Sequence, residues 1–371
     1  MNFAMTQVLC VAGARPNFMK IAPVMAALAE TGIAAQLLHT GQHYDAAMSD
    51  GFFADLGIPH PDHHLEVGSG SHAVQTAEVM KRFEPVLESV QPQAVLVVGD
   101  VNSTIACALV AAKRGVRVIH VEAGLRSYDR SMPEEINRVL TDQISDLLFI
   151  TEKSALANLQ REGIDPSRVV FVGNVMIDTL HRNLARAVPA SQTLGTTLPQ
   201  YAVLTLHRPS NVDDPAILAA LLDVVGEINR SLPVVLPLHP RTRGNIEKFG
   251  FTANLDGLHI LPPVGYLEML GLMRDAKLVL TDSGGIQEET TALGVPCLTL
   301  RENTERPITI DEGTNTLVGP NPNAIRVAFN DVMANGGKAG RIPEYWDGRA
   351  AIRIAHALKG WLPMHKGRRA A

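Results

Sequence analysis

Short apolar runs alternate along the chain with longer stretches whose apolar residues recur at helical spacing. The runs have the length of strands and end at glycine or at polar residues. This alternation predicts a parallel sheet with helices on both faces. In the first half, the predicted strands are VLCVAG, AAQLLHTG, AVLVVGD, RVIHVEAG, LLFIT and RVVFVGN.

The alternation stops once and then restarts. After the helical stretch VMIDTLHRNLARAV, residues 189–200 (PASQTLGTTLPQ) are polar and rich in turn formers, which predicts a linker. The strands that follow it are YAVLTLHR, VVLPLHP, LHILPPV, KLVLTDS, VPCLTL and TNTLVG.

The sequence therefore predicts an α/β protein of two doubly wound lobes, residues 1–176 and 200–348. An amphipathic helix at about 350–366 is expected to pack back on the first lobe. Ligands bind such sheets beyond the carboxyl ends of the strands, so we expect an active-site cleft between the lobes.

Composition narrows the class of function. A net charge of -5 argues against a nucleic-acid binder, and no apolar run is long enough for a membrane helix. The opening MNFAMTQVLCVAG lacks a basic leader region, which favours the cytoplasm. Cys10, Cys107 and Cys297 lie in apolar segments and are predicted to be reduced core residues.

Polar residues gather directly after the predicted strands of the first lobe, in GARPN, TGQHYD, GDVNST and HVEAGLRS. Each has a simple structural explanation when taken singly: Asp100 caps a helix, Arg15 solvates a turn and His43 is a satisfied loop histidine. Because charged residues recur at strand ends, we expect a ligand site there. MPEEINR has the proline and acidic residues of an ordinary helix start.

The second lobe repeats this arrangement in TLHRPSN, PLHPRTR, TDSGG and RENTERP. The cationic residues beside the SGG turn suit a diphosphate, because guanidinium groups and a helix N-terminus both favour anions. Glu305 followed by Arg306 is equally typical of a surface ion pair. The candidates from these segments are His207, Arg208, His239, Arg241, Ser283, Glu305 and Arg306.

The stretch TDSGGIQEE turns from an apolar strand into a helix. Gly284 and Gly285 let the backbone pass close to a ligand, and the first N–H groups of the helix favour phosphate. Ser283 is also explained as an ordinary N-cap. Glu288 and Glu289 would repel a phosphate, so we expect a carboxylate here to reach past it to sugar hydroxyls.

Other cofactor and catalytic motifs are missing from the sequence. It contains no GxGxxG after the first strand, no GxxxxGK[ST], no GxSxG and no HExxH. Without the glycine motif we expect no bound nicotinamide. The histidines show no paired spacing on one helix, so we expect no metal site.

Eight segments of the chain occur in the order GARPNFMKIAPV, TGQHYD, VVGDVNST, HVEAGLRS, MPEEINR, LTLHRPSN, TDSGGIQEE and ENTERP. Together they resemble the non-hydrolysing UDP-N-acetylglucosamine 2-epimerase family from about residue 8 to 320. The resemblance implies two Rossmann-like lobes of the glycosyltransferase-B type, a homodimer and no cofactor. It also implies conversion of UDP-N-acetylglucosamine to UDP-N-acetylmannosamine for surface polysaccharide synthesis, through UDP elimination, a glycal and re-addition.

Position by position, the resemblance makes Asp100, Glu122 and Glu134 acid/base candidates and puts His207 near the diphosphate. Which carboxylate takes the proton stays open. The positions implied to hold UDP are Arg15, Lys20, Ser283, Gly284, Gly285 and Glu289, with Glu289 on the ribose. Arg208, His239 and Arg306 are added as UDP-binding candidates because they follow predicted strands of the second lobe.

The chain also departs from the family pattern. Pro209, Ser210 and Asn211 follow Arg208 where the best-studied bacterial members carry an arginine and an acid, and Tyr44 follows Gln42 and His43 where they carry an arginine. Gln42 and His43 are the candidates for binding a second nucleotide sugar as activator, which this departure leaves open.

The segments GQHYD and MPEEINR also resemble those of relatives that act on UDP-diacetamido-glucuronate, so the identity of the substrate stays open. A glycosyltransferase of the same fold, a hydrolysing 2-epimerase and a non-catalytic nucleotide-sugar binder are the rival interpretations.

Overall fold

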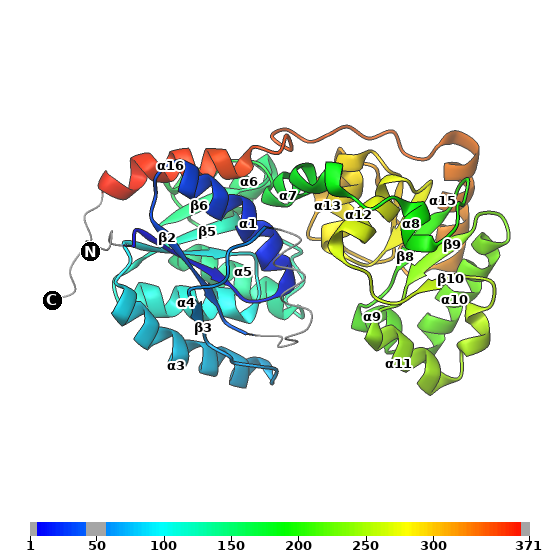
Figure 1. Cartoon of the computed structure of the whole chain (residues 1–371), viewed down its shortest axis with the longest axis horizontal. Helices are drawn as coiled ribbons and strands as arrows, with labels where there is room; N and C mark the ends of the chain where they lie inside the picture. The colour runs from blue at the N-terminus through cyan, green and yellow to red at the C-terminus, as the bar shows by residue number, and fades with distance from the viewer. Residues whose placement is uncertain (1–5, 42–56, 365–371) are drawn as a thin grey trace. The chain divides into compact units, whose positions relative to one another are not determined.

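The computed structural model describes residues 6–41 and 57–364, which form two compact units (Figure 1). The first unit runs to Thr179 and takes up the chain again from Glu344, and the second is Leu180–Pro343. The division falls inside helix α7 (Val175–Asn183).

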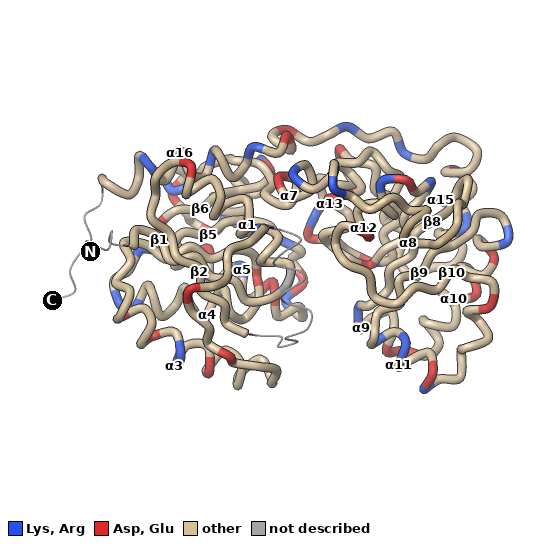
Figure 2. Tube along the Cα trace, viewed as in Figure 1, with Lys and Arg blue, Asp and Glu red and all other residues tan. Residues whose placement is uncertain are grey.

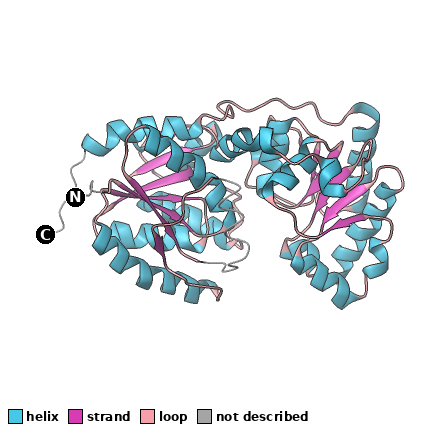
Figure 3. Cartoon of the chain, in the orientation of Figure 1, coloured by secondary structure: helices cyan, strands magenta, loops and turns pink. Residues whose placement is uncertain are grey.

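The first unit is built on a sheet of parallel strands in the order β3-β2-β1-β4-β5-β6-β7, flanked by helices (Figure 3). Its further elements are β1 (Val8–Ala12), α1 (Arg15–Glu30), β2 (Ala35–His39), β3 (His63–His64), α3 (His72–Val90), β4 (Ala94–Val98), α4 (Asn102–Lys113), β5 (Arg117–Ala123), α5 (Pro133–Ile144), β6 (Leu147–Ile150), α6 (Lys153–Arg161), η1 (Pro166–Arg168), β7 (Val169–Phe171) and α16 (Ala350–Met364).

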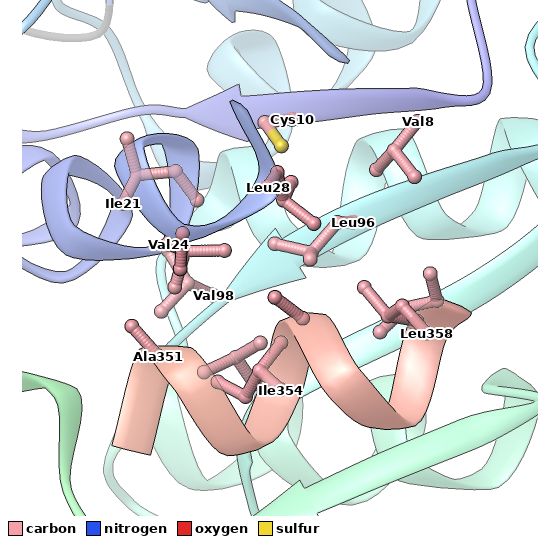
Figure 4. Packing of buried hydrophobic residues seen from close by; sticks show 14 of the residues in the cluster. Val8, Cys10, Ile21, Val24, Leu28, Leu96, Val98, Ala351, Ile354 and Leu358 are labelled. Atoms are coloured by element: carbon pink, nitrogen blue, oxygen red, sulfur yellow. The ribbon is translucent and has the colours of Figure 1, made fainter. Parts of the chain in front are cut away.

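Both faces of this sheet are buried, which explains why its strands are continuously apolar. Along β1, Val8 and Cys10 face α1 and α16, whereas Leu9 and Val11 face the core formed with α3 and α4. Figure 4 shows Ile354 and Leu358 of α16 packed beneath β1 and β4. The three cysteines are buried and free, as the sequence predicts.

The second unit repeats this plan with the parallel order β10-β9-β8-β11-β12-β13. Its elements are η2 (Leu184–Arg186), α8 (Ala190–Leu194), β8 (Ala202–Thr205), α9 (Pro209–Val212), α10 (Pro215–Asn229), β9 (Val234–Pro237), α11 (Pro240–Phe249), η3 (Thr252–Leu255), β10 (His259–Leu261), α12 (Tyr266–Arg274), β11 (Leu278–Thr281), α13 (Gly284–Leu293), β12 (Cys297–Thr299), α14 (Pro307–Asp311), β13 (Asn315–Leu317) and α15 (Pro322–Asn335).

Helix α16 is tied to the first unit by hydrogen bonds as well as by its apolar face. Both carboxylate oxygens of Asp178 accept from its first backbone N–H groups, at 3.0 Å from Ala350 and 2.7 Å from Ala351. Just before α16, the chain crosses Gly173 so closely that a Cβ there would lie 2.1 Å from the carbonyl oxygen of Tyr345. Gly173 also has φ +88°, so glycine is required on both grounds.

Two expectations about the elements are corrected. Residues 189–200 are not a structureless linker, because they contain α8 and because Ala190, Leu194 and Leu198 pack against the core of the second unit. The edge strand β3 escaped prediction because two residues are too short for a periodic signal.

Charged residues of both signs are interspersed along each unit (Figure 2). Among the described residues, no helix combines the length and the apolarity needed to cross a membrane. Those residues also contain no group of three or more histidine, cysteine, aspartate or glutamate side chains placed to hold a metal ion.

Candidate active site

The loops that carry the candidate residues lie where each sheet reverses its strand order. In the first sheet, β1 and β4 are neighbours at the reversal; in the second, β8 and β11 are. At such a point the chain departs to opposite faces of the sheet and leaves the carboxyl edge open to a ligand. Lys20 and Asp100 follow β1 and β4, and His207 and Ser283 follow β8 and β11.

Glu122 lies in a β-bulge near the end of β5. The pairing of β5 with β6 shifts register between Val121 and Ala123, and Glu122 has φ +73°. A left-handed conformation strains a residue that carries a side chain, and such strained residues cluster at functional sites. Bulges also redirect a side chain. The chain accepts local strain in order to orient this carboxylate.

The structure brings Glu122 and Lys20 together in an ion pair, and both side chains are buried. Gly99, after β4, borders the pair: a Cβ on it would lie 3.5 Å from Lys20 Nζ and 3.6 Å from Glu122 Oε2. Gly99 has φ +70°, so a larger residue would be strained as well as crowded. The sequence marked both charges as candidates but gave no sign that they pair.

Asp100 does not cap α4, because the N-cap of that helix is Val101. Its carboxylate instead lies 2.7 Å from Arg138 Nη2, and its carbonyl oxygen accepts from Asn137 Nδ2 at 2.9 Å. Both partners come from α5, which also carries Glu134, half-buried in its first turn. Arg138 stands in MPEEINR, but no spacing in the sequence links it to Asp100.

The neighbouring Glu135 is buried and holds a loop. Its carboxylate accepts hydrogen bonds from the backbone N–H groups of Ser127 (3.0 Å) and Tyr128 (2.9 Å) and pairs with Arg138 at 2.7 Å. The two glutamates of MPEEINR therefore differ: Glu135 is engaged in structure, and Glu134 remains the candidate for chemistry.

In the second unit, the buried Asp282 orients His207. Its carboxylate lies 2.9 Å from His207 Nδ1 and accepts from the backbone N–H groups of His207 and Arg208 at 3.0 and 2.9 Å. Burial alone would raise the pKa of Asp282, but the hydrogen bonds and the imidazole hold it below its ordinary value. Asp282 lies within TDSGG, but nothing in the sequence distinguishes it from an ordinary turn residue.

His239 is the N-cap of α11, where its Nδ1 accepts from the backbone N–H of Arg241 at 3.2 Å. Its ring centroid lies 5.6 Å from that of His207. Burial first, and then the neighbouring imidazole, lowers the pKa of His239. Arg241 is paired with Asp213 at the surface.

Ser283 occupies the N-cap position of α13, but its side chain makes no capping hydrogen bond. The ordinary capping explanation therefore does not account for this serine. Gly284 is buried, and a Cβ on it would lie 2.8 Å from Glu305 Oε1. The glycine turn leaves the first N–H groups of α13 without a capping side chain, which is the arrangement that suits an anion.

Charged side chains surround this turn, and all of those named here except Arg208 are buried. Arg301 lies 2.8 Å from Glu305, Arg208 lies 3.7 Å from the same carboxylate, and Arg306 Nε lies 2.7 Å from Glu288 Oε1. Glu305 and Arg306 are both buried, so the alternative of a surface ion pair is wrong.

Glu289 is a buried carboxyl group that accepts from the Tyr266 hydroxyl at 2.9 Å. Burial raises its pKa to about 7, with the charge of Glu288 acting in the same direction and the Tyr266 hydrogen bond opposing both. Arg15 is the first residue of α1, and its side chain, like Gln42 and His43 altogether, lies outside the described residues.

Two doubly wound parallel sheets, each with charged residues at the point where its strand order reverses, define an α/β protein of the glycosyltransferase-B class. The family model for UDP-N-acetylglucosamine 2-epimerase matches residues 26–359. The chain belongs to the UDP-N-acetylglucosamine 2-epimerase family.

Relatives and solved structures agree with this assignment. A UDP-N-acetylglucosamine 2-epimerase of Methanococcus maripaludis is 44% identical over 85% of this chain and 88% of its own length. A UDP-2,3-diacetamido-2,3-dideoxy-D-glucuronate 2-epimerase of Pseudomonas aeruginosa is 42% identical over 95% and 99%. The crystal structure of the Methanocaldococcus jannaschii UDP-GlcNAc 2-epimerase in complex with UDP-GlcNAc and UDP has a TM-score of 0.88, with 40% identity over 95% and 99%.

The buried carboxyl of Glu289 predicts a pH dependence of stability. Its folded pKa of about 7 exceeds the ordinary 4.5, so the folded state retains a proton that the unfolded chain releases. The resulting stability is complete below pH 4.5 and is lost as the pH rises through 7, a change of about 3 kcal/mol. Glu289→Gln, which stays neutral, should lack this loss.

Calorimetric melting of both proteins at pH 5 and pH 8 measures the difference for the second unit. Trp346 and Trp361 both lie in the first unit, so tryptophan fluorescence identifies which transition belongs to that unit. The exposed Glu247→Gln in α11 is the matched control. If wild type and Glu289→Gln lose the same stability between the two pH values, Glu289 is not a high-pKa group.

Proposed function

We propose that this protein inverts carbon 2 of a UDP-N-acetylated sugar, interconverting UDP-N-acetylglucosamine and UDP-N-acetylmannosamine. The observation that carries the proposal is the site chemistry in a chain of this family. The first sheet presents Asp100, Glu122 and Glu134 near its carboxyl edge, and the second presents a glycine turn at a helix N-terminus. These are the groups that proton transfer and diphosphate binding require.

The second unit supplies the nucleotide contacts in this proposal. The first N–H groups of α13, with Ser283, Gly284 and Gly285, receive the diphosphate, and Glu289 binds the ribose hydroxyls. His207, held by Asp282 through Nδ1, directs Nε2 away from that partner and toward the phosphate oxygens. Arg208 and Arg306 add positive charge there, and His239, whose pKa is lowered, joins them as a hydrogen-bonding imidazole. Arg15 and Lys20 are the nucleotide-binding candidates of the first unit.

Elimination and re-addition transfer no hydride, so this route needs no hydride carrier. The bond between C1 and the diphosphate oxygen breaks and its electron pair leaves with UDP. A carboxylate removes the proton from C2, which gives the glycal. Protonation of C2 from the opposite face and attack of UDP on C1 complete the inversion. Hydrogen bonds and positive charge at the diphosphate stabilise the charge that builds up there.

The carboxylates are held differently, which suits them to different tasks. Glu122 shares a buried ion pair with Lys20, so a positive charge is at hand when protons move. Asp100 is held by Arg138, and Glu134 is half-buried at the start of α5. We assign these three residues to acid/base transfer at the sugar.

We also propose that the chain works as a homodimer, in the cytoplasm, to supply surface polysaccharide precursors. Ile136 and Leu140, one helical turn apart on α5, are 48% and 49% exposed and offer an apolar surface to a second copy. Sedimentation equilibrium of wild type and of Ile136→Asp tests the dimer, which the variant should weaken. A wild-type monomer at micromolar concentration would contradict it.

Proton NMR of UDP-N-acetylglucosamine incubated with the protein in D₂O tests the reaction. Appearance of UDP-N-acetylmannosamine with deuterium at C2 is the expected result, because the removed proton exchanges with solvent. A parallel reaction with UDP-2,3-diacetamido-2,3-dideoxy-D-glucuronate decides which sugar is turned over faster. A free sugar would indicate hydrolysis, transfer to an acceptor would indicate a glycosyltransferase, and two unchanged substrates would overturn the proposal.

Asp100→Asn and Glu122→Gln should each lower turnover by about 10² to 10⁴, the usual contribution of a general acid or base. UDP affinity, measured by calorimetric titration, should stay within about twofold for Asp100→Asn, since Asp100 has no part in the proposed nucleotide contacts. Glu30→Gln, an exposed carboxylate at the end of α1, is the control and should match wild type. Full turnover in both variants would remove these carboxylates from the mechanism.

A further inference from the structure

His120, which has no role in the proposed reaction, is a fully buried histidine close to the candidate residues of the first unit. His120 belongs to β5, two positions before Glu122, and its side chain has no exposed surface. Its Nδ1 lies 2.7 Å from Asp142 Oδ1, and its Nε2 lies 2.9 Å from the carbonyl oxygen of Gly99. Both ring nitrogens are therefore engaged.

The partners decide how many hydrogens the ring carries. A backbone carbonyl can only accept, so Nε2 must carry a hydrogen. Asp142 Oδ2 accepts from Arg126 Nη2 at 2.6 Å and from the backbone N–H of Gly124 at 3.1 Å. These two donors favour the anionic form of Asp142, so its Oδ1 accepts from Nδ1, and Nδ1 must carry a hydrogen too.

We propose that His120 is a buried imidazolium that acts as a positioning residue for the acid/base carboxylates. Neutrality of the surroundings supports this, because Arg126 is shared between Asp142 and Glu162 at 2.6 Å from each. The two cations then face two carboxylates, which removes the cost of an unpaired buried charge.

What His120 positions follows from the elements that it joins. Gly99 begins the turn after β4 and is followed directly by Asp100, whereas Asp142 lies in the last turn of α5. Toward its start, the same helix carries Glu134 and holds Asp100 through Arg138 and Asn137. Through its two ring nitrogens, His120 therefore connects α5 to the Gly99 turn, and this connection fixes Asp100 and Glu134 relative to each other.

The inference rests on the proposed function for its kinetic part only. His120→Gln keeps its two N–H donors on one amide nitrogen, so it cannot replace two donors that sit on different ring nitrogens. It should lower kcat by up to about 100-fold while KM and UDP affinity change less than about twofold, because misplacement affects the transition state. Asp142→Asn should act in the same direction. The exposed His356→Gln in α16 is the matched control and should leave kcat unchanged.

A spectroscopic measurement tests whether both ring nitrogens of His120 carry a hydrogen. In ¹⁵N-labelled wild type, the imidazole of His120 should give two N–H correlations, both absent from the spectrum of His120→Gln. This measurement needs no turnover, so it stands even if the D₂O assay gives no product, and it needs only wild type if Asp142→Asn does not fold. A single N–H on the ring, or an unchanged kcat in both folded variants, would overturn the proposal.

Discussion

The structure depends on one constraint, the parallel pairing of every strand in both sheets. Parallel strands need a crossover after each strand, and every crossover starts from the same edge of its sheet. The loops at that edge are therefore brought together although they are far apart in sequence, as Lys20 and Glu122 are. Where the strand order reverses, neighbouring loops leave in opposite directions, and the polar side chains gather at that point.

Placing charges at such an edge has an energetic cost, because burial removes them from water. Ion pairs between oppositely charged side chains offset this cost. Glu122 is paired with Lys20, Asp100 with Arg138, and Arg306 with Glu288. Breaking one such pair would leave a buried charge unmatched, which is strongly destabilising. The pairs therefore serve position as much as stability, since each fixes a functional group in one geometry.

Much of the fold was predictable because burial on both faces makes the strands continuously apolar. The strands from VLCVAG to TNTLVG were predicted from this pattern, and among the strands of the described residues only the short β3 was absent from that set. The error at residues 189–200 has a clear cause. Polar composition predicted a linker, but the short helix α8 packs Ala190 and Leu194 against the core of the second unit, and Leu198 after the helix packs there too.

The sequence identified many residues of the candidate site, but it did not show which of them form ion pairs or hydrogen bonds with one another. Strand ends marked Asp100, Glu122, His207 and Ser283, because polar residues after apolar runs stand out. The partners Arg138, Asp282 and His120 did not stand out, since they lie within helices, turns or strands and their roles depend on contacts across the fold. The raised pKa of Glu289 likewise follows from burial, which composition does not reveal.

The central claim is that UDP leaves the sugar during the reaction. It can be tested with UDP-N-acetylglucosamine carrying ¹⁸O in the bridge between C1 and the diphosphate. If UDP departs and returns, the label should spread from the bridge to the non-bridging oxygens of the β-phosphate. Deuterium at C2 with all of the label still in the bridge would contradict the account, because the C1–oxygen bond would then have stayed intact.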